Sequence, residues 1–146
     1  YHLWKDEQDH QTGDVKDGVP FQPDFKQQDE VFHGFVKRYP NIKCIARHVR
    51  YAHSCSENSL MAYLWYDGKT YESQKLRFHI LDRVGGGDAF VSGIIYALMN
   101  EYKPQDIADF GVAASAVKHT IHGDGNITDD VSLIEHIMQM NFDIKR

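Results

Sequence analysis

Three consecutive glycines followed by an aspartate form the segment of this chain whose residue types best suit chemistry. Gly85, Gly86 and Gly87 precede Asp88, with an alternating segment before them and an amphipathic pattern after them. This order predicts a strand, a tight glycine turn and a helix N-terminus, and glycine lets the backbone approach a ligand closely. Unpaired N–H groups and the helix dipole at such a terminus favour anions, so the pattern predicts a phosphate-binding turn.

Asp88 needs its own explanation, because a carboxylate beside bound phosphate is electrostatically unfavourable. A base that takes a proton from an attacking hydroxyl explains its presence best. The segment is not a P-loop, since no Lys-Ser or Lys-Thr follows the glycines, and it lacks the third glycine of the dinucleotide motif. A glycine-rich connection without any function explains the local sequence equally well.

The first half of the chain predicts a helix followed by a strand. Residues 1–23 are polar and without sustained periodicity, which is typical of a short helical end and a loop. Asp24 is a candidate N-cap for a helix that Tyr39 and Pro40 end. The segment 42–49 is short and apolar enough to predict a buried strand, for which parallel pairing is expected.

The middle of the chain predicts a hairpin and one more strand before the glycine turn. Asp67-Gly68 lies between the apolar segments 59–66 and 69–73, which is a strong hairpin signal. Alternation at 76–80 predicts the strand that leads into the glycines. These strands must present the turn at one end of a sheet.

The second half predicts three helices. The first covers about 87–102, the second begins at Pro104, and a loop at 119–128 follows. Asp129 or Asp130 then caps the last helix. Helix, strands and helices in this order suit a layered α/β sheet, in which ligands lie at the carboxyl ends of the strands.

Composition excludes several classes of function. The chain has 146 residues, 42% of them hydrophobic and 25% charged, as in an ordinary soluble domain. A net charge of −5 without a basic stripe argues against a nucleic-acid partner. We see no apolar run of membrane-spanning length and no signal peptide, so we expect no membrane association. Cys44 and Cys55 lack a disulfide framework, which suits a cytoplasmic location.

The segment 82–90 resembles the C-terminal signature of ribokinase-like (PfkB family) carbohydrate kinases, usually Asp-Thr-x-Gly-Ala-Gly-Asp. The variant found here, Asp-Arg-Val-Gly-Gly-Gly-Asp, resembles the 2-keto-3-deoxygluconate kinases of that family, and the segments 39–43, 50–54 and 118–126 fit the same subgroup. The resemblance implies a layered α/β/α ribokinase-like sheet, of which 24–146 would be the C-terminal, nucleotide-binding part. The sugar-binding half, its lid and an Asn-x-x-Glu magnesium motif are not recognisable, so we expect a C-terminal portion of such a kinase.

The resemblance also implies a reaction. ATP would transfer a phosphoryl group to a hydroxyl of a sugar acid, with 2-keto-3-deoxygluconate giving its 6-phosphate as the leading expectation. Asp88 would be the base, and the backbone of Gly85, Gly86 and Gly87 would form the anion hole, which is what phosphoryl transfer requires of a protein. Mg²⁺ would arrive with the nucleotide, held mainly by phosphates and water.

Three further residues near the turn have two interpretations each. Asp82 either stabilises the turn or binds a monovalent cation such as K⁺, together with carbonyls of Val84 and of the loop after His119. Arg83 has a planar fork that suits a triphosphate or the carboxylate of a sugar acid, although a surface salt bridge would serve as well. Asp124 matches a family position that approaches the substrate or the cation.

Nucleotide contacts are expected in two more places. Arg50 and Ser54 follow the strand where the family's phosphate-contacting loop lies, and a solvated loop is the alternative. Ala114 and His119 fall where the family packs the adenine ring, although core packing explains the alanine as well. The histidine clusters around His48 and His119 match no known zinc spacing.

Competing functions remain open at this point. A kinase of another sugar or of a nucleoside would keep the fold and change only the acceptor. A nucleotide-binding fragment without turnover is the non-enzyme alternative. A dehydrogenase is disfavoured, because helix follows helix where another strand is needed. A homo-oligomer is consistent with the family, in which dimers are common.

Overall fold

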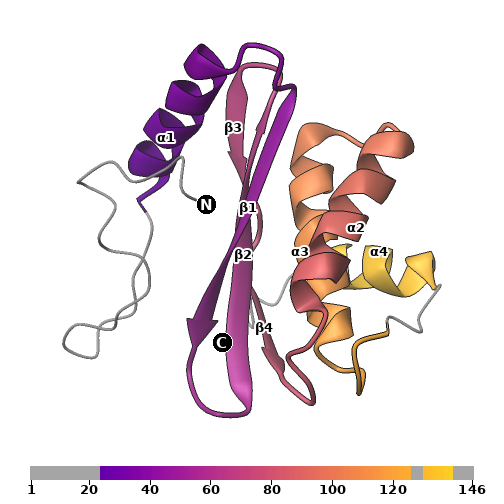
Figure 1. Ribbon diagram of the computed structural model, residues 1–146. Helices are drawn as coiled ribbons and strands as arrows, with labels where there is room; N and C mark the ends of the chain where they lie inside the picture. The colour runs from indigo at the N-terminus through magenta and orange to yellow at the C-terminus, as the bar shows by residue number, and fades with distance from the viewer. Residues whose placement is uncertain (1–23, 126–129, 140–146) are drawn as a thin grey trace, which may run out of the picture.

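The computed structural model describes residues 24–125 and 130–139, which form three layers. Helix α1 (Phe25–Arg38) covers one face of a four-stranded sheet, and α2 (Gly86–Met99) and α3 (Pro104–Lys118) cover the other (Figure 1). The strands are β1 (Cys44–Ala52), β2 (Glu57–Tyr66), β3 (Lys69–Glu72) and β4 (Leu76–His79), and α4 (Val131–Gln139) packs on α3. The predicted layered α/β/α arrangement is confirmed, while the expectation for 1–23 lies outside the described residues.

The sheet is organised around β2, which pairs with all three other strands. Every pairing is antiparallel, and within the described residues β1 pairs on one side only. Most of β1 is exposed or half-buried, so the strand at 42–49 is not buried as predicted, and the prediction of parallel pairing is also wrong. The reason is the short connection between β1 and β2, closed by a bond from His53 N to Glu57 O at 2.9 Å. A connection this short joins antiparallel strands, since parallel pairing needs a long crossover.

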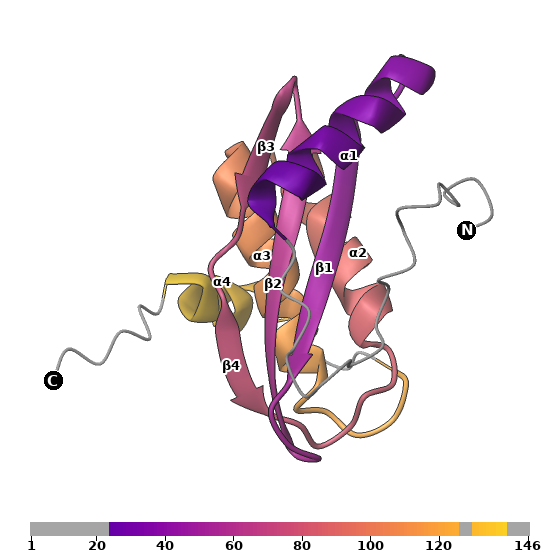
Figure 2. The ribbon, with the colours of Figure 1, turned by 90° about the vertical axis from the view of Figure 1, so that its left-hand side faces the viewer.

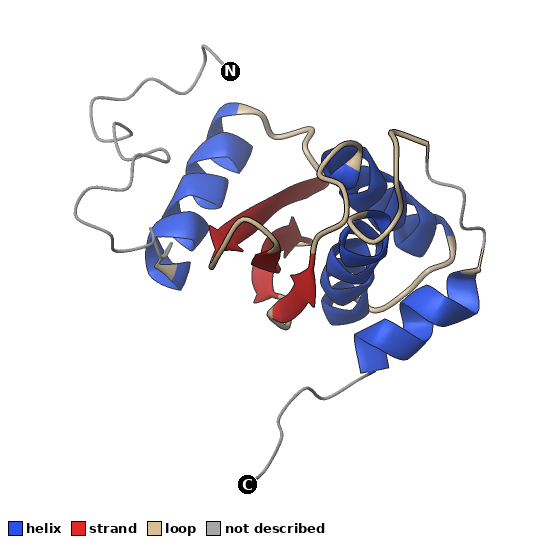
Figure 3. Ribbon diagram, turned by 90° about the horizontal axis from the view of Figure 1, so that it is seen from below, coloured by secondary structure: helices blue, strands red, loops and turns tan. Residues whose placement is uncertain are grey.

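The carboxyl ends of β1 and β4 nevertheless lie at the same end of the sheet. Both strands run antiparallel to β2, where Asn58 is the partner of Ala52 on one side and of Phe78 on the other. The loops that follow these two strands therefore gather at one end of the molecule, as the view from below shows (Figure 3). The glycine turn follows β4 at that end.

The hairpin prediction at Asp67-Gly68 is confirmed. Tyr66 of β2 pairs directly with Lys69 of β3, which leaves a two-residue turn. Both turn residues have positive φ, 48° for Asp67 and 83° for Gly68, as a type I′ hairpin requires. This turn lies at the end of the sheet opposite to the glycine turn.

Two apolar clusters hold the layers together. Alternation along β2 sends Met61, Tyr63 and Trp65 toward Phe32 of α1, which crosses the sheet in Figure 2. The larger cluster joins the other face of β2 to α2, α3 and α4. Helix α3 is buried almost throughout, so it is the central helix of this layer.

Helix boundaries follow the predicted signals closely. Asp24 caps α1 through a bond from Lys26 N at 3.1 Å, and Pro104 is the first residue of α3. Helix α2 ends at Met99, three residues before the predicted limit of 102. The chain leaves the helical path there because Glu101 adopts a left-handed φ of 57°.

Helices α2 and α3 approach each other closely through glycines, and this contact gives a first prediction. A Cβ on Gly93 would lie 2.9 Å from Ala114 Cβ and 3.1 Å from Gly111 Cα. We expect Gly93→Val to lower the free energy of unfolding by about 1–3 kcal/mol through overpacking. Gly34→Ala is the matched control, because α1 has open space there and alanine should stabilise the helix by about 0.5–1 kcal/mol. Denaturant melts measure both, and an unchanged midpoint for Gly93→Val would contradict the close contact.

Candidate functional site

The glycine turn places an open helix N-terminus at the end of β4. Gly85 is the N-cap of α2 and adopts a left-handed φ of 78°, without a side-chain cap. The first helical bond runs from Ala89 N to Gly85 O at 2.9 Å. The N–H groups of Gly86, Gly87 and Asp88 therefore have no acceptor within the helix, and their dipoles point out of its end. This geometry suits an anion.

Two of the three glycines are required by the space around them. A Cβ on Gly85 would lie 2.8 Å from the carbonyl oxygen of Asp124, and one on Gly86 would lie 2.3 Å from Cε1 of His119. Gly87 differs, because its nearest neighbour would be His48 Cε1 at 4.0 Å. The turn is thus pressed against the loop after α3 at its first two positions and open at its third.

Asp88 is the third residue of α2 and is exposed at the mouth of the turn. The helix dipole stabilises a carboxylate in this position. An exposed carboxylate beside open N–H groups can accept a proton from a hydroxyl that approaches an anion bound there. Its role as the base remains a prediction.

Asp82 ties the start of the turn to the loop after α3. Its Oδ1 accepts a bond from Val84 N at 3.1 Å, and its Oδ2 accepts one from Gly123 N at 2.8 Å. These two backbone bonds hold the pKa of Asp82 below its usual range, and the charge of Lys118 adds to them. The turn-stabilising contact expected from the sequence is therefore present.

Lys118 lies at the end of α3, where a monovalent cation was expected from the resemblance. Its Nζ donates to the carbonyl oxygens of Ile121 at 3.2 Å and Gly123 at 2.6 Å. These are carbonyls of the loop after His119, whose oxygens would have to ligate K⁺. The residues present do not fit a free monovalent cation here, because an ammonium group already binds the oxygens.

Two histidines line the inner side of the turn. His119 packs its ring on Gly86 and on Phe78, at a centroid distance of 5.2 Å, and its Nδ1 lies 2.7 Å from Ser115 O. The ring of His48 lies 4.8 Å from that of Phe90. Burial lowers the pKa of both imidazoles, and neighbouring positive charges lower them further.

These depressed pKa values predict a loss of stability in mild acid. The unfolded imidazoles titrate near their ordinary value of 6.5, whereas the folded ones resist protonation. Between about pH 7.5 and pH 5.5 the unfolded chain binds more protons, so the free energy of unfolding should fall as the pH falls. NMR titration should give pKa values below 6.5 for His48 and His119.

The variant His119→Asn keeps an amide donor near Ser115 and removes one titrating group. The free energy of unfolding of this variant should therefore depend less steeply on pH. Urea melts across this pH range give the free energy of unfolding of both proteins. If it changes equally steeply with pH in the variant and in the natural chain, the pKa of His119 is not lowered.

The remaining predicted contacts fall in three different environments. Arg50 is an exposed residue of β1 and does not follow the strand as predicted, because β1 extends to Ala52; in addition to burial, its positive charge lowers the pKa of His119. Arg83 is exposed and donates from Nη2 to Cys55 O at 3.0 Å, which links the glycine turn to the β1–β2 connection. Ser54 lies in that connection, where its Oγ accepts a bond from Ser56 N at 3.2 Å. The roles of all three in nucleotide or substrate binding stay predictions.

Ala114 and Asp124 are also placed by the structure. Ala114 is buried between α3 and α2, opposite Gly93, so its contact with an adenine ring stays a prediction that nothing in this packing favours. Asp124 is exposed in the loop and turns its carbonyl oxygen toward Gly85.

Sequence reasoning missed two side chains at this end of the sheet. His48 lies on β1 two residues before Arg50, so the strand period of two could have placed both on one face. Asn58 is fully buried at the start of β2, and neither its Oδ1 nor its Nδ2 has a hydrogen-bond partner in the described part of the chain. Buried amides usually have hydrogen-bond partners, and nothing in the pattern of the sequence indicates that this one has none.

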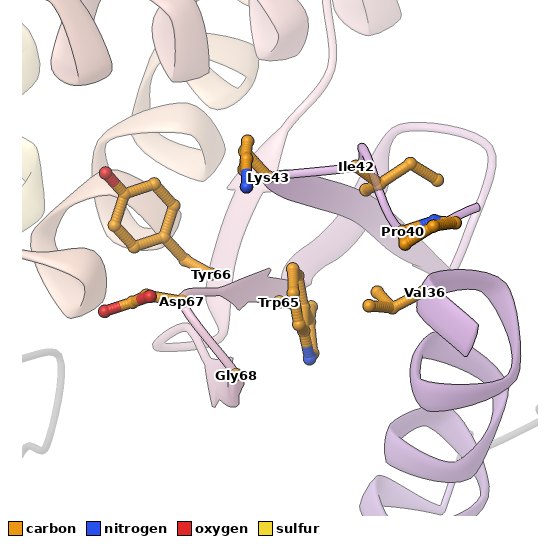
Figure 4. Close-up of a pocket in the computed structure, with 8 residues that line it drawn as sticks. All are labelled: Val36, Pro40, Ile42, Lys43, Trp65, Tyr66, Asp67 and Gly68. Atoms are coloured by element: carbon orange, nitrogen blue, oxygen red, sulfur yellow. The ribbon is translucent and has the colours of Figure 1, made fainter. Parts of the chain in front are cut away.

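A hollow on the described surface lies elsewhere. It has a volume of about 570 Å³ and is lined by Val36, Lys43, Trp65 and the Asp67-Gly68 turn, among others (Figure 4). Its position beside the hairpin puts it at the opposite end of the sheet from the glycine turn. It therefore takes no part in the candidate site.

Residues 24–125 and 130–139 contain no group of three or more His, Cys, Asp or Glu side chains placed to hold a metal ion. Their helices are also too short or too polar to span a bilayer.

Comparison with known proteins gives a consistent family. The model of the pfkB family carbohydrate kinases matches residues 61–130, which include the glycine turn. A 5-dehydro-2-deoxygluconokinase of Clostridium botulinum is 31% identical over 71 residues, which cover 49% of this chain and 20% of that protein. A Clostridium tetani protein with the same enzyme name is 32% identical over 78 residues, which cover 53% of this chain and 22% of that protein.

Solved structures share the fold as well. A 2-dehydro-3-deoxygluconokinase of Thermotoga maritima superimposes with a TM-score of 0.74 at 28% identity, covering 83% of this chain and 37% of that one. A putative 2-keto-3-deoxygluconate kinase of Enterococcus faecalis gives a TM-score of 0.70 at 29% identity, with coverage of 88% and 38%. The matched segment is thus about a fifth of the curated relatives and over a third of these solved chains.

Proposed function

We propose that this chain is the C-terminal portion of a ribokinase-like, PfkB-family carbohydrate kinase and that it supplies the phosphoryl-transfer site of a sugar-acid kinase. The match of the family model to residues 61–130 and the likeness to solved kinases support this proposal. The observation that carries the proposal is the open N-terminus of α2 with Asp88 at its mouth. It provides backbone donors for a transferred phosphoryl group and a carboxylate for the acceptor hydroxyl.

The proposed reaction transfers the γ-phosphoryl group of ATP to a hydroxyl of the acceptor. As the hydroxyl oxygen bonds to phosphorus, its proton passes to a carboxylate oxygen of Asp88, and the bond from phosphorus to the leaving ADP oxygen breaks. The N–H groups at Gly86, Gly87 and Asp88 stabilise charge on the phosphoryl oxygens. Mg²⁺ supplies further charge neutralisation when it arrives with the nucleotide.

The acceptor we propose is a six-carbon keto-deoxy sugar acid. The names of the relatives differ here: a solved relative acts by name on 2-dehydro-3-deoxygluconate, and the curated ones act by name on 5-dehydro-2-deoxygluconate. Both acids have a carboxylate and a hydroxyl that can accept phosphate. Phosphorylation of 2-keto-3-deoxygluconate at its 6-hydroxyl remains the leading proposal, and the curated names support the second acid as the alternative.

The test is turnover by the whole gene product and by this chain separately. Each is incubated with magnesium-ATP and either keto-deoxy acid, with ribose, fructose and a nucleoside as further acceptors, and release of ADP is measured. Turnover of one keto-deoxy acid by the whole product supports the proposal and decides between the two acids. Turnover of ribose or a nucleoside alone would replace the acceptor, and nucleotide binding without any turnover would favour the fragment alternative.

A further inference from the structure

The ammonium group of Lys118 is the most deeply enclosed charge of the described chain outside the proposed chemistry. Its side chain is fully buried, with a relative exposure of 0%. Lysine is almost never buried completely unless partners compensate the lost hydration of the ammonium group. The partners of Lys118 therefore indicate what its charge does.

Those partners form a set of oxygens beside the glycine turn. Nζ donates to the carbonyls of Ile121 and Gly123, at 3.2 Å and 2.6 Å. The carboxylate of Asp82 is bound to the N–H of the same Gly123, at 2.8 Å. Two backbone carbonyls and a nearby carboxylate are the hard oxygen donors that a monovalent cation prefers.

The stem of Lys118 also touches the turn itself. A Cβ on Gly85 would lie 3.1 Å from Lys118 Cε, so the methylene chain packs directly beneath the first glycine. The ammonium group thus places one positive charge behind the N–H groups that open toward the anion site. It also holds the loop that contains Asp124, whose carbonyl oxygen would lie 2.8 Å from the same Cβ.

We propose that the Lys118 ammonium group is a built-in monovalent cation, which holds the loop carbonyls and the Asp82 carboxylate against the glycine turn in place of K⁺. An ammonium ion has the charge and nearly the size of K⁺, and a tethered one needs no recruitment from solution. The proposal deepens the proposed kinase function, on which its consequence for turnover rests: the reaction will not require added K⁺.

A simple helix cap is the alternative role for this lysine. Helix α3 ends at Lys118 itself, and the two acceptor carbonyls lie three and five residues beyond it. A capping lysine would bind carbonyls of the last helical turn, which precede the helix end. The acceptors observed here belong to the loop instead.

The experiment measures thermal unfolding of the chain in choline, sodium, potassium and ammonium chloride at equal ionic strength. We expect the natural chain to melt at one temperature in all four salts. Lys118→Ala removes the charge and leaves space, so its lowered melting temperature should rise by about 5 °C in potassium or ammonium chloride over choline chloride. Lys118→Met fills most of the space without charge and should not be restored. Lys103→Met, at the exposed other end of α3, is the control for loss of a lysine.

Each outcome decides the proposal. A natural chain that gains stability from K⁺ would overturn it, because a cation site would then exist beside Lys118. Failure of potassium and ammonium to restore Lys118→Ala would also overturn it, and so would equal restoration of Lys118→Met. If Lys118→Ala does not fold in choline chloride, its folding in potassium or ammonium chloride is measured instead of a melting temperature. Folding in these salts supports the proposal, and failure to fold in them overturns it.

These measurements do not depend on turnover, so failure of the proposed kinase function would leave them interpretable. Where the whole gene product is active, its rate in potassium and in choline salts adds a second test. Equal rates support a tethered cation, and a rate that requires K⁺ overturns it.

Discussion

Asp88→Asn is expected to lower kcat of the whole kinase by about 10²–10⁴-fold, the usual contribution of a general base. The amide of asparagine cannot take the proton that the acceptor hydroxyl loses. The asparagine side chain has the same size as the carboxylate that it replaces, and it occupies the same position in the first turn of α2. Binding of magnesium-ADP should therefore change little, because the backbone donors of the turn remain.

A matched control for this substitution exists on the next helix. Asp106 is the third residue of α3, as Asp88 is of α2, so both carboxylates interact with a helix dipole in the same position. Asp106→Asn should leave kcat unchanged and cost the same small dipole energy. Steady-state kinetics with saturating ATP separates the two variants. If Asp88→Asn keeps its natural rate, another group must take the proton.

Gly86→Ala is the second substitution with a large expected effect, and it should weaken magnesium-ADP binding by about tenfold or more. The added methyl would lie 2.3 Å from Cε1 of His119, so one of the two must move. His119 is buried, and its Nδ1 lies 2.7 Å from Ser115 O, which leaves the start of α2 as the part that shifts. A shift there displaces the N–H groups that would bind phosphate.

Two companion variants make this explanation specific. Gly87→Ala adds a methyl where the nearest atom is 4.0 Å away, so it should bind nucleotide almost as the natural chain does. Combining Gly86→Ala with His119→Gly removes the obstructing ring and should recover much of the affinity. Calorimetric titration with magnesium-ADP measures all three. No recovery in the double variant would mean that the methyl acts through something other than His119.

The elements with local signals could be predicted from the sequence, and those set by long-range pairing could not. Asp24, Pro104 and Asp67-Gly68 each act through backbone geometry within a few residues, so their helix ends and hairpin were predicted correctly. The orientation of β1 was not predicted correctly, because a short, partly apolar strand is compatible with either direction. The short connection that decides it carries only exposed residues between His53 and Glu57.

The candidate site shows the same division. Glycines before a helix predicted the open N-terminus, since that chemistry is local. The obstruction of Gly86 by His119 joins residues 33 positions apart, and no spacing rule connects them. The burial of Lys118 could not be predicted either, because a lysine at a helix end is usually solvated. Only the fold shows that its charge is enclosed.

Within the residues that the structure describes, β1 pairs on one side only, and this open edge bears on how the sheet can meet other chains. Its outer edge offers the N–H and C=O groups of a nine-residue strand, which is long enough to template the addition of a further strand. Arg47 and Arg50 lie on this strand three residues apart, and so on opposite faces, and two paired copies of β1 would place two guanidinium groups on each face of the ribbon. Such like-charge crowding opposes fibre growth through self-pairing. We therefore expect the edge to accept a neutral or acidic strand more readily than a copy of itself.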